Sequence, residues 1–256
     1  MKENILGYAV DVMSSELCTD SVFHMLTESS ERGKGCRWLA CLNPHSYTVA
    51  LEDGDFAEAL NGADWLIPDG AGVVLASRIL GGSIRQRVTG SDVFFGLQER
   101  MSVHGGLSVF FLGGTSKTLK EICQKVGRDY PGIRVLGTYS PPFKASYSEG
   151  EIDEMVKRVN AVSPDVLWVG MTAPKQEKWL HQNRDRLQVR FAGAVGAVFD
   201  FYTGQVKRSS PTFQRLGLEW LPRLIQQPRR LWRRTLVSAP VFLWHVVKQK
   251  VRGVQR

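Results

Sequence analysis

Asp69 is the residue whose type and position point most directly to chemistry. It stands between a proline and a glycine, directly after an apolar run that ends at 68. A carboxylate that faces a cleft from this position can take a proton from an attacking hydroxyl group. Aspartate is also a favoured N-cap residue, and for Asp69 taken alone capping is the more common role. Both interpretations stay open until the neighbouring segments are considered.

Two other segments contain residue types that bind phosphate. Gly113 and Gly114 end the apolar run 107–114, and backbone N–H groups at the start of the following helix suit a phosphate. A tight turn between a strand and a capped helix explains the same glycines equally well. Arg85 and Arg87 precede a helix start, and arginine favours bidentate partners such as phosphate. A solvated charged loop is the simpler explanation of this pair.

Gly170 and Gln176 belong to a third candidate segment. Gly170 follows an apolar run, and Pro174 suits the first position of a helix, which places Gln176 in the first helical turn. Gln176 could there donate a hydrogen bond to a sugar hydroxyl or to a phosphate. An ordinary helix start explains the segment without a ligand, and it is favoured when the segment is taken alone.

Other familiar centres lack their residues. The five histidines are scattered, with no HExxH motif and no recognisable Ser/His/Asp spacing. The four cysteines have no CxxC spacing and do not cluster with histidines, which indicates reduced thiols and neither a zinc site nor disulfides. GxGxxG and GxxxxGK[ST] are absent, which disfavours a standard dinucleotide site and a P-loop. We expect no metal site.

The elements that must position these residues alternate along the first 200 residues. Short apolar runs predict buried parallel strands at 38–43, 64–69, 107–114, 133–139, 165–171 and 189–200. The segments between them predict helices at 47–63, 72–80, 91–102, 115–130, 148–162 and 174–187. This alternation predicts an α/β fold with a mostly parallel sheet covered by helices.

Ligands of such sheets bind at the carboxyl ends of the strands. That rule groups residues at the ends of the predicted strands or in the loops that follow them: Asn43, Asp69, Gly113, Gly114, Gly170, Gln176 and Asp200.

The positive charge of the chain is concentrated in its last part. Residues 206–256 contain twelve Lys or Arg and one acid, a net charge of +11, whereas residues 1–205 carry −3. We therefore expect an α/β domain over 1–205 and a basic helical appendage over 206–256. Arginines in the appendage alternate with Trp220, Trp232 and Trp244. This pattern suits an anionic membrane surface, packing on the core, or nucleic acid.

Membrane insertion is not expected. The longest apolar run, 236–247, is too short to span a bilayer, and the N-terminus lacks the design of a signal peptide. Pro222, Pro228 and Pro240 are predicted to break the appendage into short helices. An exposed apolar appendage could also drive the formation of homo-oligomers.

Together these segments resemble the WecG/TagA/CpsF family of bacterial glycosyltransferases. The resemblance covers about Trp38 to Trp232 and rests on seven strings in order: CLNPHSYTVAL, ADWLIPDGAGVVLASRILGG, RVTGSDVF, FFLGG, PDVLWVGMTAPKQEKWL, GAVGAVFDFYTGQVKRSSP and GLEWLPRLIQQPRRLWRR. It implies a Rossmann-like fold and an inverting, metal-independent transfer from a UDP-sugar, with no further cofactor. The acceptor would be a polyprenyl diphosphate-linked sugar at the cytoplasmic membrane face, as in the synthesis of exopolysaccharides, teichoic acid linkers or common antigen.

The resemblance also implies roles for individual residues. Asp69 matches the family base, and Asn43 and Gln176 match site residues. Arg87 matches an arginine near the diphosphate. Arginines on the appendage would close over the site and engage phosphate; they are Arg223, Arg230 and Arg233. Cys41 stands where many relatives have threonine, which puts that hydroxyl contact in doubt and suggests a different donor.

Three points stay open at the level of the sequence. The donor sugar could be glucose, N-acetylmannosamine or its uronic acid. A non-enzymatic basic adaptor that binds membranes or polyanions is an alternative to the transferase, with nucleic acid the least favoured partner of the appendage. A nucleotide-sugar hydrolase is the other alternative.

Overall fold

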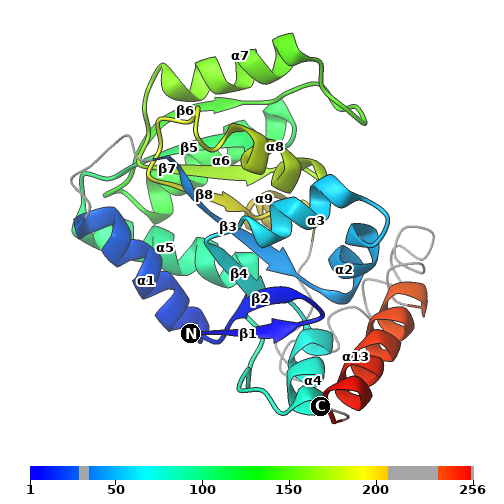
Figure 1. Cartoon of the computed structure of the whole chain (residues 1–256). Coiled ribbons are helices and arrows are strands. Elements are labelled where there is room, and N and C mark those ends of the chain that lie inside the picture. The colour runs from blue at the N-terminus through cyan, green and yellow to red at the C-terminus, as the bar shows by residue number, and fades with distance from the viewer. Residues whose placement is uncertain (29–34, 207–235, 255–256) are drawn as a thin grey trace.

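A six-stranded parallel sheet forms the centre of the molecule (Figure 1). The computed structural model describes residues 1–28, 35–206 and 236–254. The strands lie in the order β4-β3-β8-β7-β5-β6. Their bounds are β3 (Arg37–Leu42), β4 (Trp65–Pro68), β5 (Ser108–Gly113), β6 (Arg134–Tyr139), β7 (Val166–Gly170) and β8 (Phe191–Ala194). All six predicted strands are present, and the predicted α/β class is confirmed.

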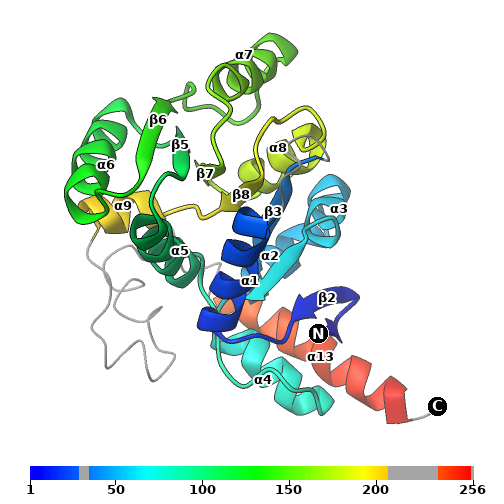
Figure 2. The same cartoon turned by 90° about the vertical axis from the view of Figure 1, so that its left-hand side faces the viewer.

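Helices cover both faces of this sheet, as the edge-on view of Figure 2 shows. Alternate strand residues bury opposite faces, so Trp38 and Ala40 join one hydrophobic cluster while Leu39 joins the other. The first cluster packs α2 (Pro44–Ala50), α3 (Gly54–Asn61), α7 (Glu149–Asn160) and α8 (Lys175–Asn183). The second packs α1 (Ser15–Glu28), α5 (Gly90–His104), α6 (Ser116–Asp129) and α9 (Val198–Thr203).

Among the predicted elements that differ in extent, two change the description of the chain. The expected strand 189–200 ends at Ala194, because Gly196 adopts a left-handed φ of 57° and α9 begins at Val198. Asp200 therefore lies on a helix and not at the end of a strand. The expected helix 47–63 is two helices, since the Asp53 side chain accepts a hydrogen bond from Phe56 N at 3.1 Å and starts α3.

The N-terminal residues form a hairpin that the sequence analysis did not predict. β1 (Lys2–Ile5) pairs antiparallel with β2 (Tyr8–Asp11). Asp11 interrupts the apolar pattern of this segment because it has a structural task. Its buried carboxylate accepts a hydrogen bond from Leu66 N at 2.8 Å, in β4, and lies 3.5 Å from Lys2 Nζ. Burial raises the pKa of Asp11.

The helix α13 (Ser238–Val254) packs on α2 and on α4 (Ala71–Leu80). Phe242 and Val246 on its inner face are fully buried, so packing on the core is confirmed for this face. Pro240 does not break the helix. It is the third residue of α13, which continues beyond it to Val254. Pro222 and Pro228 lie outside the described residues.

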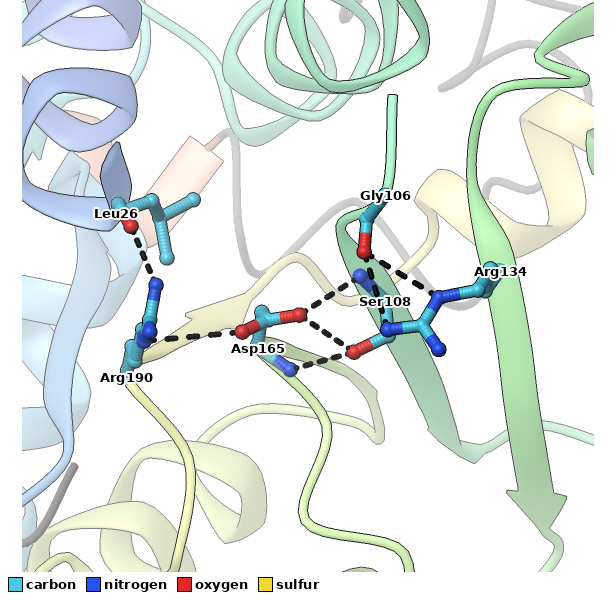
Figure 3. A network of polar contacts seen from close by, with 6 residues as sticks. All are labelled: Leu26, Gly106, Ser108, Arg134, Asp165 and Arg190. Atoms are coloured by element: carbon cyan, nitrogen blue, oxygen red, sulfur yellow. Dashed lines mark hydrogen bonds and ion pairs between the residues drawn. The ribbon is translucent and has the colours of Figure 1, made fainter. Parts of the chain in front are cut away.

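A polar network joins the amino ends of three neighbouring strands (Figure 3). Asp165, just before β7, accepts hydrogen bonds from Ser108 N at 2.9 Å and from Ser108 Oγ at 2.6 Å, at the start of β5. Its other oxygen lies 3.7 Å from Arg190 Nε, and Arg190 also donates to Leu26 O in α1 at 2.6 Å. This end of the sheet is tied together by structural contacts, which leaves the carboxyl ends for a site.

Candidate active site

The carboxyl ends of β3 and β8 border the candidate site. These strands are neighbours, yet the chain leaves β3 into α2 on one face and leaves β8 into α9 on the other. Ligands of α/β sheets bind at such points, outside the carboxyl ends of the strands. The loops after β4 and β7 lie at the same carboxyl edge of the parallel sheet.

Asp69 follows β4 directly and is held there by its backbone, because its N–H donates to Leu42 O at 2.8 Å. The capping interpretation is wrong for this residue. The N-cap of α4 is Gly70, whose φ of 113° favours glycine, and no side chain caps that helix. The carboxylate is partly exposed, and its Oδ2 lies 3.5 Å from Asn43 Nδ2.

Asn43 links a helix start to the candidate base. Its Oδ1 caps α2 by accepting hydrogen bonds from His45 N at 3.1 Å and Ser46 N at 2.9 Å. These two bonds fix the orientation of the amide, so the Nδ2 group is the end that faces Asp69. The observed N-cap of α2 and the predicted site residue are thus the same residue, and the helix begins earlier than the predicted start at 47.

Arg87 lies beside the end of β4, because Val88 N donates to Pro68 O at 2.9 Å. The Arg87 side chain is partly buried. Arg85 is different: its side chain is exposed and donates to Gly82 O at 2.7 Å. The simpler interpretation as a charged loop fits Arg85, whereas the position of Arg87 near a substrate phosphate stays a prediction.

Cys41 lies near the carboxyl end of β3, and its side chain faces the start of α5. A Cβ atom added at Gly90 would lie 3.6 Å from Cys41 Sγ, so the helix start packs closely on the thiol. Burial raises the pKa of Cys41 well above its usual value, and the carboxylates of Asp69 and Glu177 raise it further. At neutral pH this side chain is therefore a neutral thiol, and it is poorly suited to act as a nucleophile.

Gln176 lies in the first turn of α8, as predicted, and Glu177 follows it there. Pro174 is the N-cap of this helix and not its first residue. Gln176 Oε1 accepts a hydrogen bond from Gly196 N at 3.1 Å, and Gln176 Nε2 donates to Glu177 Oε1 at 2.8 Å. Both side chains are buried. The desolvation of the carboxyl raises the pKa of Glu177 to about 7.

Sequence reasoning gave Glu177 no role in the site. An acid in the first turn of a helix is ordinary, since it favours the helix dipole. The acid is buried because α8 packs against elements distant in the sequence, such as α3 and β8, and no local pattern reports that packing. The adjacent Gln176, which the resemblance selected, is the one sequence signal for its neighbourhood.

The glycines of the predicted turns are required by close packing. Gly113 pairs with Gly170 across β5 and β7, and a Cβ atom at Gly113 would lie 2.6 Å from Gly170 O. A Cβ at Gly170 would collide with the ring of Phe199. Gly114 leads into α6, which Thr115 caps. A tight turn therefore accounts for Gly113 and Gly114, and contact with a ligand phosphate stays a prediction.

The remaining predicted residues are placed less closely. Asp200 lies on α9 beside Phe199, whose ring packs over Gly170 and Gly114 at the carboxyl ends of β7 and β5. The appendage arginines Arg223, Arg230 and Arg233 lie outside the described residues. Within the described part of the chain, no group of three or more His, Cys, Asp or Glu side chains could hold a metal ion.

Known proteins resemble the chain over most of its length. A family model described as "Glycosyl transferase WecG/TagA/CpsF family" matches residues 3–256. A protein of Bacillus spizizenii named N-acetylglucosaminyldiphosphoundecaprenol N-acetyl-beta-D-mannosaminyltransferase is 32% identical, over 94% of this chain and 90% of its own length. A protein of the same name from Bacillus subtilis is 30% identical over 83% of this chain and 79% of its own length. One from Staphylococcus aureus is 27% identical over 83% and 80%.

Proposed function

The chain belongs to the WecG/TagA/CpsF family of glycosyltransferases, and we propose that it transfers a hexosyl residue from a UDP-sugar to a sugar carried on a polyprenyl diphosphate. The observation that carries this proposal is the position of Asp69. The carboxylate follows β4 at the carboxyl edge of the sheet, does not cap α4, and lies 3.5 Å from Asn43 Nδ2. A transferase of this type needs one such base beside the acceptor hydroxyl.

In the proposed reaction Asp69 takes the proton of the acceptor hydroxyl while that oxygen attacks the anomeric carbon of the donor. The bond from the anomeric carbon to the phosphate oxygen breaks, and UDP leaves with the electron pair. Attack opposite to the leaving group inverts the anomeric centre. The relatives' names specify a beta-linked product, as inversion of an alpha-linked donor gives. Asn43 Nδ2 would hold the carboxylate in orientation for the proton transfer.

The leaving diphosphate needs positive charge to stabilise it. We expect Arg87 to supply part of that charge from its place beside β4, and Arg223, Arg230 and Arg233 to supply the rest. Gly113, Gly114, Gly170, Gln176 and Asp200 would line the donor side of the site. No metal and no cofactor besides the donor is part of this proposal.

We expect the protein to be peripheral, at the cytoplasmic face of the membrane, where its lipid-linked acceptor would be found. No helix in the described ranges is long and apolar enough to cross a membrane. The outer face of α13 exposes Trp244, Val247 and Val251, beside basic residues. This composition suits an anionic membrane surface. His45 Nδ1 lies 3.1 Å from Ser238 Oγ, which places the start of α13 against the first turn of α2, next to Asn43.

The names of the relatives suggest the first substrates to test. They act on N-acetylglucosaminyldiphosphoundecaprenol and transfer N-acetylmannosamine. A transfer assay should therefore combine UDP-N-acetylmannosamine, its uronic acid and UDP-glucose in turn with a short-chain polyprenyl diphosphate N-acetylglucosamine. EDTA should leave the rate unchanged, and Asp69→Asn should abolish transfer without lowering Tm.

Controls separate this function from the alternatives. Release of UDP without an acceptor, at the rate seen with it, would identify a hydrolase of nucleotide sugars. A folded protein that binds vesicles but yields no product with any donor would contradict the transferase and favour an adaptor.

A further inference from the structure

Glu177 is a buried acid for which the proposed reaction has no task. Its side chain is 3% exposed, and that of the neighbouring Gln176 is 4% exposed. Gln176 contacts the loop that follows β8 through Gly196 N, and the Glu177 carboxylate is close enough to Cys41 to raise the pKa of that thiol. A carboxyl group at such a place either stabilises the fold or arranges a neighbour, and its contacts distinguish the two roles.

The amide of Gln176 is held at both of its ends. Its oxygen accepts from Gly196 N at 3.1 Å, and its nitrogen donates to Glu177 Oε1 at 2.8 Å. A glutamine amide has one oxygen and two N–H groups. The two contacts therefore define which end of the amide faces the loop after β8, and they leave one N–H of Gln176 for a further partner.

Stabilisation of the fold is a poor explanation of Glu177. Its second oxygen, Oε2, is buried and has no hydrogen-bond partner among the described residues. Burial of a polar atom without a partner costs stability, so an apolar side chain of similar size would pack here at lower cost. The one hydrogen bond that the described structure gives the carboxyl from another side chain comes from Gln176 Nε2.

We propose that Glu177 is a positioning residue, which fixes the amide of Gln176 so that its second N–H is presented to the donor substrate. The inference rests on the proposed function. Gln176 is then the residue that touches the sugar or the phosphate, and Glu177 acts through it. The pKa of about 7 is consistent with this role, because a protonated and an ionised carboxyl both keep an oxygen that accepts from Gln176.

The test is a double-mutant cycle in the transfer assay. Gln176→Ala should lower kcat/KM about 10- to 100-fold, which is the effect expected when one hydrogen bond to a charged or reacting group is lost. Glu177→Leu should cause a loss of similar size, because the Gln176 amide loses its acceptor. In the Gln176→Ala background Glu177→Leu should have no further effect, since Glu177 acts only through Gln176. Glu177→Gln should keep kcat/KM within about threefold, because its amide oxygen still accepts the bond.

A packing control lies on the same helix. Leu180 is fully buried in α8, and Leu180→Ala should lower Tm while it leaves kcat/KM unchanged at temperatures where the variant is folded. Tm is measured for every variant, and Glu177→Met replaces Glu177→Leu if the leucine variant does not fold. If reduced stability by itself lowered kcat/KM, both Leu180→Ala and Glu177→Leu would lose activity. If the loss comes from the position of the Gln176 amide, kcat/KM falls only in Glu177→Leu.

Several results would overturn the inference. Equal losses from Glu177→Leu with and without Gln176 would show that Glu177 acts elsewhere. A loss in Glu177→Gln as large as in Glu177→Leu would show that the accepted hydrogen bond is not what matters. If Gln176→Ala is fully active while Asp69→Asn is inactive, the inference fails and the proposed function stands. If Asp69→Asn is also fully active, the proposed function itself is wrong.

Discussion

Asn43 caps α2 with its Oδ1 atom and faces Asp69 Oδ2 with its Nδ2 atom at 3.5 Å. One amide therefore connects the stability of a helix start to the orientation of the proposed base. The two tasks use different atoms, so substitutions can separate them. Serine keeps a side-chain oxygen that can cap α2 but has no group that reaches as far as the Asn43 amide nitrogen.

We predict that Asn43→Ser leaves the free energy of unfolding within about 0.5 kcal/mol of the wild type but lowers kcat about tenfold. Asn43→Ala should show the same loss of kcat and an additional loss of about 1 kcal/mol in stability, because α2 loses its cap. Urea denaturation and steady-state kinetics measure the two effects. A serine variant with full kcat would show that the contact with Asp69 is not used.

The glycines at the strand ends should be intolerant of even one methyl group. Gly113 has a φ of 106°, and a Cβ there would lie 2.6 Å from a backbone oxygen of β7. We predict that Gly113→Ala destabilises the protein by about 2–3 kcal/mol, measured by urea denaturation. The matched control is Gly127→Ala in α6, where a Cβ meets nothing within 4 Å. That variant should be stabilised by about 0.5–1 kcal/mol, and equal destabilisation of both would contradict the close-packing argument.

The apolar runs along the chain predict the sheet well because five of its six parallel strands, all except the edge strand β6, consist mostly of buried residues. A strand that is buried on both faces appears in the sequence as a continuous apolar run. The same runs do not show where a strand stops. Gly196 ends β8 by its left-handed φ, and the apolar residues that follow form α9 instead of a longer strand. The sequence was therefore right about the strand and wrong about the position of Asp200.

The N-terminal hairpin and Glu177 could not be predicted for a different reason. Both depend on contacts between segments far apart in the sequence: Asp11 accepts its hydrogen bond from Leu66 N, and Glu177 is buried on α8, which packs against α3 and β8. The strands of the hairpin are only four residues long, too short for periodicity to decide. Among the predicted site residues, Asn43 and Asp69 are the pair whose side chains the structure brings to 3.5 Å, and each directly follows a strand.

The burial of Glu177 predicts a pH dependence of stability. Its pKa is raised from an ordinary 4.5 to about 7 in the folded protein, so the folded state favours the protonated form. Below pH 4.5 both the folded and the unfolded protein hold this proton, and burial of the neutral carboxyl carries no ionisation penalty. As the pH rises from 4.5 through about 7, the unfolded protein releases the proton first, so the free energy of unfolding falls. Glu177→Gln removes this titration. We predict that the free energy of unfolding of the variant, relative to that of the wild type, rises by about 2 kcal/mol from pH 5 to pH 8. Urea denaturation at each pH measures this difference. A difference that does not change with pH would contradict the raised pKa.

The outer face of α13 should bind anionic membranes through its exposed apolar residues. Trp244 is 65% exposed, while Phe242 on the inner face is fully buried. We predict that Trp244→Glu weakens binding to vesicles of anionic phospholipid at least tenfold and leaves Tm unchanged, because the ring has little packing to lose. Co-sedimentation with vesicles of graded anionic content measures the affinity.

Two further variants make this prediction specific. Val103→Glu places the same charge at an 85% exposed position on α5 and should leave vesicle binding unchanged. Phe242→Ala should lower the free energy of unfolding by about 3–5 kcal/mol, because it removes a buried ring between α13 and the core. Vesicle binding by this variant then tests whether α13 must be packed on the core in order to bind the membrane. Equal loss of binding in Trp244→Glu and Val103→Glu would indicate a general effect of charge and would contradict a membrane surface on α13. Trp244 is exposed on the outer face of α13, so its substitution should not disturb the start of this helix, which contacts the first turn of α2. The Trp244→Glu protein should therefore keep its kcat on a water-soluble acceptor and lose transfer only to acceptors embedded in vesicles.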